Sequence, residues 1–187
     1  MVIVPGMFVF VANPRTGSRS VGAALETYAK VKGLTRAGCR HSPRSAVPVD
    51  LGLPVYGFTR EPVRHVLSWW YFQRQKKHID AFNEEVSRLL TFEEFIRKPF
   101  FPLNTLDFPQ QRLNLYEGIV TKWFRLEDGI EAFFEEVGLG HINDKLTRRD
   151  YIGRSGVNEG LITQETRGLV NAYFPYDCAL WKRVNRN

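Results

Sequence analysis

The chain of 187 residues lacks the marks of a metalloprotein, of a disulfide-stabilised secreted protein and of a membrane protein. Its two cysteines, Cys39 and Cys178, lie far apart and without the spacing of metal ligands. No apolar run reaches the roughly 18 residues that a membrane-spanning helix needs. We therefore expect a cytoplasmic protein with reduced cysteines and no bound metal.

Two common phosphate-binding patterns are also missing. Neither G-x-x-x-x-G-K-[ST], the Walker A loop of kinases and NTPases, nor the dinucleotide pattern G-x-G-x-x-G occurs in the sequence. The apolar N-terminal run has no basic residues before it and is interrupted by Pro5-Gly6, which argues against a signal peptide. We expect this run to be a short lead-in to the first strand.

The composition that is present fits a single domain covering residues 1–187. Hydrophobic residues make up 43% of the chain, with 14 Phe and 4 Trp, so a dense aromatic core can form. The formal net charge of +6 favours an anionic partner such as a nucleotide, an acidic or sulfated substrate, or nucleic acid. Net charge alone does not choose among these partners.

Strand patterns alternate with helix patterns along the chain. The predicted strands are the run from Phe8 up to Asn13, Leu34–Arg40, Pro54–Thr59 and Ile119–Phe124. Five helices are predicted. The first contains Val21 to Tyr28, the second begins at Pro62, and the third follows a capping box at Thr91–Glu94. The fourth runs from Glu127 to Val137, and the last main helix starts at Thr163. This order predicts an α/β domain with a mostly parallel central sheet flanked by helices. Residues 73–112 are expected to form a helical or loop insertion.

The stretch from Phe8 to Tyr28 carries the first functional pattern. A buried strand leads through the turn Asn13-Pro14-Arg15-Thr16-Gly17-Ser18-Arg19-Ser20 into a helix. The first turn of a helix has unpaired N–H groups and partial positive charge, so it favours an anion. Arg15 adds a full positive charge, and Thr16, Ser18 and Ser20 add hydroxyl donors. The turn therefore predicts a site for a phosphate-like or sulfate-like group.

A second pattern follows the strand Pro54–Thr59. It consists of Arg60-Glu61-Pro62, with Ser68 eight residues after Arg60 on the next predicted helix. A guanidinium and a hydroxyl held on a rigid helix suit a dianionic phosphate. Together the two patterns resemble the sulfotransferases, whose 5′-phosphosulfate loop reads Pro-[Lys/Arg]-[Thr/Ser]-Gly-[Ser/Thr]-x-[Ser/Thr] and whose Arg-x-Pro and Ser bind a 3′-phosphate. Trp123 to Asp128 and Tyr173 to Trp181 are similar to later segments of that family. Among its branches, the chain looks most like the carbohydrate-type group, which carries a His between the first two motifs.

The resemblance implies a P-loop NTPase-like sulfotransferase fold and 3′-phosphoadenosine 5′-phosphosulfate (PAPS) as the co-substrate. It implies that the nucleotide is bound by Arg15, Thr16, Gly17, Ser18, Arg19, Ser20, Arg60, Ser68 and, from a late basic loop with Arg148 and Arg149, by Arg154. The acceptor would be a small molecule or a carbohydrate, held near residues 73–112. No nucleic acid, membrane or metal is implied as a partner, and the oligomeric state stays open.

Catalysis by such an enzyme needs a cation at the leaving group and a base at the acceptor. Arg15 is the predicted cation, although many family members have Lys at its position. His41 is the predicted base, because related carbohydrate-type enzymes place one after the second strand. His65 stands where many members have Arg, and we expect it to be structural. His78 and His141 are expected at the surface.

Three other functions remain open from the sequence. A P-loop kinase or NTPase would need a Walker lysine and an acidic Mg²⁺ ligand after a strand, and neither is evident. A nucleic-acid-binding module would fit the positive charge, but no zinc-finger or RNP motif is present. A sulfotransferase-like domain that binds PAP or PAPS without catalysis has no sequence feature against it.

Overall fold

The computed structural model describes residues 1–28, 49–75, 91–97, 116, 118–146 and 158–184. Four strands form one sheet in the order β1-β2-β3-β4. They are β1 (Val2–Val4), β2 (Phe8–Val11), β3 (Val55–Thr59) and β4 (Lys122–Arg125). β1 is antiparallel to β2, whereas the β2–β3 and β3–β4 pairs are parallel. The predicted α/β class with a mostly parallel sheet is confirmed.

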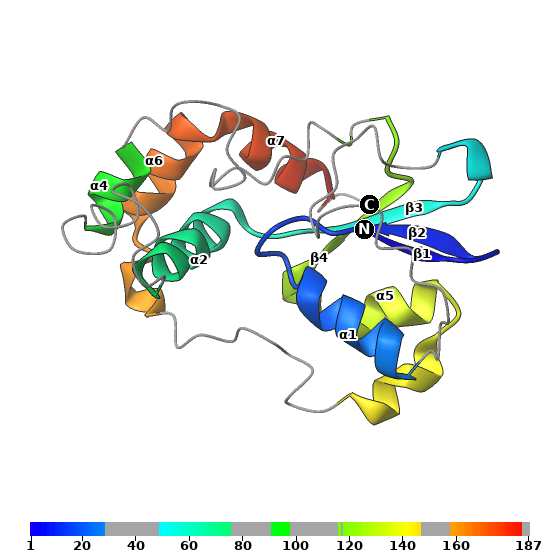
Figure 1. Cartoon of the computed structure of the whole chain (residues 1–187). Helices are drawn as coiled ribbons and strands as arrows, with labels where there is room; N and C mark the ends of the chain where they lie inside the picture. The colour runs from blue at the N-terminus through cyan, green and yellow to red at the C-terminus, as the bar shows by residue number, and fades with distance from the viewer. Residues whose placement is uncertain (29–48, 76–90, 98–115, 117, 147–157, 185–187) are drawn as a thin grey trace.

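Helices lie on one face of the sheet and beside it (Figure 1). Helices α1 and α5 share one face with the aromatic core, while α2, α4 and α6 pack against one another. The α-helices are α1 (Ser18–Tyr28), α2 (Pro62–Gln75), α4 (Phe92–Arg97), α5 (Glu131–Glu136), α6 (Gln164–Tyr173) and α7 (Pro175–Val184). Short 3₁₀ turns are η2 (Val49–Leu51), η4 (Leu126–Asp128), η5 (Gly140–Lys145) and η6 (Glu159–Leu161). None of the helices in the described ranges is long and apolar enough to cross a membrane.

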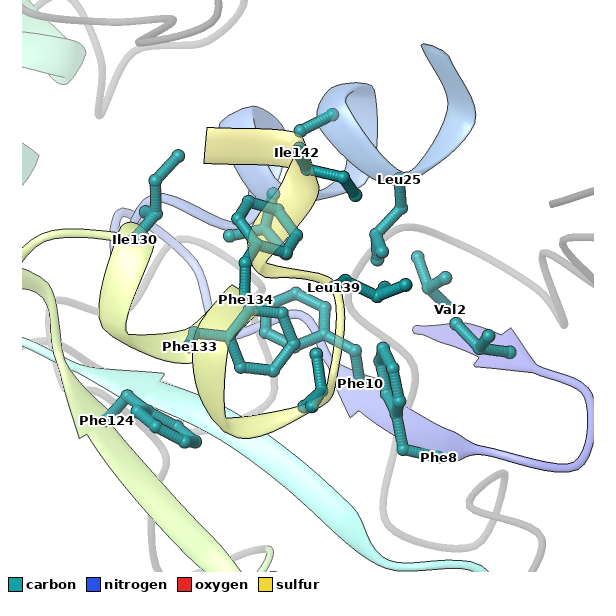
Figure 2. Packing of buried hydrophobic residues seen from close by; sticks show 14 of the residues in the cluster. Val2, Phe8, Phe10, Leu25, Phe124, Ile130, Phe133, Phe134, Leu139 and Ile142 are labelled. Atoms are coloured by element: carbon teal, nitrogen blue, oxygen red, sulfur yellow. The ribbon is translucent and has the colours of Figure 1, made fainter. Parts of the chain in front are cut away.

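The core between the sheet and α5 is aromatic and is centred on Phe133 (Figure 2). The Phe133 ring lies 5.3–5.6 Å, centroid to centroid, from the rings of Phe8, Phe10, Phe58 and Phe124. All four contacts are tilted or edge-on, and edge-on contacts are among the arrangements that aromatic pairs favour. The core therefore fixes three neighbouring strands, β2, β3 and β4, against one helix. This fixes the ends of the strands, from which the candidate site is built.

A second apolar cluster joins α2, α4, α6 and α7. Its buried members are Val63, Val66, Leu67, Trp69, Trp70, Phe92, Phe95, Ile96, Val170, Phe174 and Cys178. The predicted caps of two of these helices are present. Thr91 and Glu94 form a reciprocal capping box before α4, and the Thr163 hydroxyl accepts from the Thr166 amide at the start of α6. The cluster holds α2, and with it the residues that α2 contributes to the site.

Several predicted boundaries were wrong. The N-terminal lead-in is a strand of its own, β1, joined to β2 by a turn at Pro5 and Gly6. The strand predicted for Ile119–Phe124 begins three residues later, because the amides of Ile119 and Val120 bond back to the Tyr116 carbonyl in a turn.

The helix predicted from Glu127 to Val137 is broken in two. Gly129 has φ of 90°, outside the helical range, and divides η4 from α5. The helix at Thr163 is not the last one, since α7 follows it after Pro175. The helical spacing of Tyr173 with Leu169 and Val170 predicts the buried side of α6, yet Tyr173 is 48% exposed. The predicted strand Leu34–Arg40 and most of the 73–112 insertion lie outside the described residues.

Candidate functional site

The two motif segments meet at one edge of the sheet. β2 and β3 are neighbouring parallel strands, with Val11 beside Gly57, so the chain leaves both strands at the same edge. Residues 12–17 connect β2 to α1, and residues 60–61 connect β3 to α2. In open α/β sheets, ligands bind at the carboxyl ends of the strands. The topology therefore places both motifs where a ligand is expected.

Two fully buried side chains brace the loop after β2 from within. The Thr16 hydroxyl donates to the Asn13 carbonyl at 2.9 Å, and the Asn13 amide donates to the carbonyl of Phe58 on β3 at 3.4 Å. The Thr16 hydroxyl is thereby used inside the loop. A contact from Thr16 to an anion would come from its backbone N–H.

The backbone of the loop turns sharply before α1. Arg15 has φ of 60° and Gly17 has φ of 79°, both in the left-handed region. A β-carbon at Gly17 would also lie 2.6 Å from Leu126 Cδ1, so the position suits glycine on two grounds. Within the described part of the chain, the N–H groups of Thr16, Gly17, Ser18 and Arg19 donate no hydrogen bond. Consecutive N–H groups at a helix start form the concave donor array that binds anions.

The Arg15 side chain joins the two motifs. Its Nε and Nη2 atoms donate to the Ser68 hydroxyl oxygen at 3.0 and 2.9 Å. Its guanidinium also lies over the Phe72 ring, 4.8 Å from the centroid. Ser68 and Phe72 are one turn apart on α2, so a single face of this helix holds the guanidinium. Arg15 and Ser68, which belong to different motifs, are therefore in direct contact.

Arg60 approaches the same loop from the end of β3. Its Nη1 atom donates to the Arg15 carbonyl at 3.3 Å, and its side chain is half-buried. Two arginines from different motifs are therefore held side by side in a partly buried place. Such an arrangement is unfavourable unless an anion or a carboxylate compensates it.

The electrostatic cost of this arrangement is visible at Arg15. Burial, the charge of Arg60 and the charge of Arg19 lower the pKa of Arg15 to about 10. Burial also lowers the pKa of Arg60, partly offset by the carboxylate of Glu127. Among the described residues no carboxylate forms an ion pair with Arg15. The loop therefore carries positive charge that a bound anion would stabilise.

Other nearby cations are paired with acids of the protein itself. Arg64 donates to Glu61 at 2.7 Å and to both carboxylate oxygens of Glu159, and Arg167 pairs with Glu61. This network ties α2 to η6 and α6. Arg64, which is one position away from an arginine common in the sulfotransferases, is thus engaged in the fold.

His65 contacts the loop from α2. Its ring is fully buried, its Nε2 atom lies 3.0 Å from the Pro14 carbonyl oxygen, and its edge packs on Trp69. The predicted structural environment of His65 is therefore present, and its partner is the first motif. His141 is exposed, as expected, and His78 lies outside the described residues.

The remaining predicted site residues divide into two groups. Ser18, Arg19 and Ser20 lie in the first turn of α1, where Ser18 is half-buried, Arg19 exposed and Ser20 buried. His41 and Arg154 lie outside the described residues, as do Arg148 and Arg149. The described part of the site thus unites Arg15 to Ser20 with Arg60 and Ser68. Its general base and its late basic loop remain predictions.

Two contributors were not predicted from the sequence. Phe72 supports the Arg15 guanidinium, and its position four residues after Ser68 is the pattern that could have indicated it. Glu127 accepts a hydrogen bond from the Glu61 amide at the start of α2, at 3.0 Å. No local pattern connects residues 61 and 127, because their contact depends on the β3–β4 pairing.

No family model matches the chain, and no match was found among curated proteins or solved structures. Function therefore has to be inferred from the residues and their geometry.

Proposed function

We propose that the chain is a PAPS-dependent sulfotransferase, which transfers a sulfuryl group to a hydroxyl or amine of a small-molecule or carbohydrate acceptor. The observation that carries the proposal is the convergence of Arg15, Arg60 and Ser68. Arg15 bonds to Ser68 across 53 positions of sequence, and Arg60 bonds to the Arg15 carbonyl across 45. The resemblance to sulfotransferases and the P-loop-like fold that it implies rest on these same residues.

PAPS carries negative charge on its 5′-phosphosulfate and on its 3′-phosphate, and each motif can bind one of these groups. The 5′-phosphosulfate would lie on the open N–H groups of residues 16–19 at the start of α1, with Arg15 beside it. The 3′-phosphate would lie against Arg60 and Ser68. Binding would compensate both the burial of the Arg15 charge and its repulsion by Arg60 and Arg19, which together lower the pKa of Arg15. The charge of the ligand and the charge of the site are therefore complementary.

The reaction is an in-line displacement at sulfur. The acceptor oxygen or nitrogen forms a bond to sulfur while the bond from sulfur to the bridging oxygen breaks, and its electron pair stays on the 5′-phosphate of the product PAP. The acceptor proton leaves to a base. Negative charge grows on the bridging oxygen, so a preorganised cation and N–H groups lower the barrier.

Arg15 can supply this stabilisation while it remains bonded to Ser68. A guanidinium has five N–H donors, and Ser68 accepts from the Nε and Nη2 atoms of Arg15. The Nη1 group and the second Nη2 hydrogen are left to reach an anion. Since the guanidinium stays protonated at neutral pH, Arg15 stabilises charge and does not transfer a proton.

The base proposed for the acceptor is His41. Among the described histidines, His65 is buried with its Nε2 atom on the Pro14 carbonyl, and His141 is exposed on η5, an element that packs against α5. A histidine suits the task because its pKa lies near neutrality. His41→Ala should abolish turnover and leave PAP affinity nearly unchanged.

Calorimetric titration tests the nucleotide site. PAP and adenosine 5′-phosphate, which lacks the 3′-phosphate, are titrated into wild type and Arg60→Ala. We expect PAP to bind wild type and to bind Arg60→Ala about 10- to 100-fold more weakly, the loss of a charged hydrogen-bonded contact. Adenosine 5′-phosphate should bind both proteins equally. Arg97→Ala, which removes an exposed charge on α4, is the matched control for net charge.

The outcomes separate the competing functions. Failure of folded wild type to bind PAP or PAPS would refute the proposal. Binding followed by PAP release in the presence of an acceptor supports a sulfotransferase, and binding without release across hydroxyl and amine acceptors supports a non-catalytic PAP-binding domain. Tight binding of ATP with no preference for a 3′-phosphate would favour a kinase-like protein.

A further inference from the structure

His65 contacts the anion-binding loop at its most constrained point. The carbonyl oxygen of Pro14 lies 3.0 Å from His65 Nε2, and a carbonyl can only accept a hydrogen bond. The Nε2 atom must therefore carry a proton and donate it. The ring is fully buried, so this bond is not weakened by competition with water.

This bond fixes the peptide plane that precedes Arg15. The Pro14 carbonyl and the Arg15 amide belong to one rigid plane. The carbonyl of the next plane, at Arg15 itself, accepts from Arg60 Nη1 at 3.3 Å. Both planes that define the Arg15 backbone are therefore held by residues of the segment after β3. The conformation that they hold, with φ of 60°, is strained for a non-glycine residue and persists only where its surroundings hold it.

One face of α2 holds both the backbone and the side chain at this point. His65, Ser68 and Phe72 follow one another at i, i+3 and i+7, which places them on the same side of a helix. His65 contacts the Pro14 carbonyl, while Ser68 and Phe72 contact the Arg15 guanidinium. The direction of the guanidinium thus depends on a backbone that His65 holds.

We propose that His65 is a positioning residue for sulfuryl transfer, whose Nε2–H holds the Pro14 carbonyl so that Arg15 presents its guanidinium to the anion. The inference rests on the proposed function and deepens it. His65 acts on the ligand only through Arg15. Its effect on binding should therefore disappear when the Arg15 guanidinium is absent, which a purely structural contribution to the fold would not do.

A double-mutant cycle tests this dependence. PAP affinity is measured calorimetrically for wild type, His65→Leu, Arg15→Asn and the double variant; asparagine tolerates a positive φ, so Arg15→Asn removes the guanidinium without adding backbone strain. We expect His65→Leu to weaken binding about tenfold in wild type and less than twofold in the Arg15→Asn background. His65→Gln, whose Nε2 can donate at the same place, should remain within about threefold of wild type. Equal losses in both backgrounds would overturn the proposal.

A second measurement needs neither ligand nor mutation. The ¹⁵N spectrum of the His65 ring should show a proton on Nε2, and a proton on Nδ1 alone would overturn the proposal. Should PAP fail to bind wild type, the cycle is run with inorganic pyrophosphate. Binding of pyrophosphate with the same dependence on Arg15 would support the positioning by His65 while refuting PAPS as the ligand. Absence of binding by both anions would refute both proposals.

Discussion

Two helix N-termini lie side by side at the edge of the sheet, and they are treated in opposite ways. The turn before α1 has two residues with positive φ, and the N–H groups of residues 16–19 donate no hydrogen bond in the described part of the chain. At the start of α2, the Glu61 N–H donates to the Glu127 carboxylate at 3.0 Å, and the first residue, Pro62, has no N–H. The α1 junction is open, whereas the α2 junction is satisfied at its first two residues, Glu61 and Pro62.

The two junctions therefore contribute different groups to the candidate site. The α1 junction can bind an anion through its backbone, whereas the α2 junction contributes side chains, Arg60 before the helix and Ser68 within it. A strand, a turn and a helix are therefore insufficient to predict an anion site. The deciding feature is whether the protein's own carboxylates already accept from the backbone N–H groups at the start of the helix.

Removing the charge of the open junction should have the largest effect. Arg15→Asn keeps a residue that accepts positive φ and deletes the guanidinium. We expect PAP affinity to fall by about 100-fold, and turnover by a further 10²–10³-fold because the leaving oxygen loses its cation. Calorimetry gives the first quantity and the rate of PAP release with a working acceptor gives the second.

Arg15→Lys is the matched variant for this prediction. It retains a positive charge and resembles the lysine that many sulfotransferases have at this position. PAP affinity within about tenfold of wild type is expected, since a lysine cannot reproduce both bonds to Ser68. Wild-type affinity in Arg15→Asn would show that the open junction does not bind the nucleotide.

A methyl group at Gly17 should disturb the open junction without changing its charge. Alanine there must adopt φ near 79° and meet Leu126, so Gly17→Ala should lower the free energy of unfolding by about 1–2 kcal/mol and weaken PAP binding. Gly22→Ala, in the interior of α1 with no atom within 4 Å of the new carbon, should raise stability by about 0.5–1 kcal/mol. Urea unfolding measures both, and equal shifts would contradict the interpretation of the loop.

Local patterns predicted well those elements that are defined within one segment. The run from Phe8, the strand ending at Thr59, the proline at the start of α2 and the Thr91 capping box are all short-range features, and each was found. Errors occurred where a contact distant in sequence or a backbone angle decided the outcome. Gly129, with φ of 90°, divides the helix predicted from Glu127 to Val137 into η4 and α5.

In the candidate site too, features within one segment were predicted, and contacts between distant segments were not. The spacing of Arg60 and Ser68 indicated them as site residues because both lie within one strand–helix unit, where a phosphate, their proposed partner, would impose a fixed pattern. The contacts of His65 with Pro14 and of Glu127 with Glu61 span 51 and 66 positions. They arise from the pairing of β2 with β3 and of β3 with β4, which no single segment encodes.

Substitution of Glu127, the acid at the satisfied junction, should have smaller effects. Loss of its charge should tighten PAP binding, whereas loss of its hydrogen bond should lower stability. The Glu127 carboxylate offsets part of the charge of Arg60, so Glu127→Gln should tighten PAP binding by about two- to fivefold at low salt and not at high salt. Glu127→Ala, which also loses the acceptor for the Glu61 amide, should lower stability by about 1 kcal/mol. Glu136→Gln, on α5 and paired with Lys122, controls for net charge. Weaker binding in Glu127→Gln would mean that this carboxylate holds Arg60 in place.

The smallest effect is expected at a third helix N-terminus, that of α7. Cys178 lies near its start, where a helix usually favours a thiolate, yet burial and the neighbouring Asp177 raise the pKa of this thiol to about 11. Since the thiolate is the reactive form, Cys178 in a Cys39→Ser variant should remain unmodified by iodoacetamide at pH 8 and react only as the pH approaches 11. Mass spectrometry of the intact protein measures this, with urea-unfolded protein as the reactive control. Rapid alkylation at pH 8 would show that the helix N-terminus lowers the pKa of the Cys178 thiol more than burial raises it. A helix N-terminus would then stabilise an anion even where it is buried, which would weaken the distinction between open and satisfied junctions.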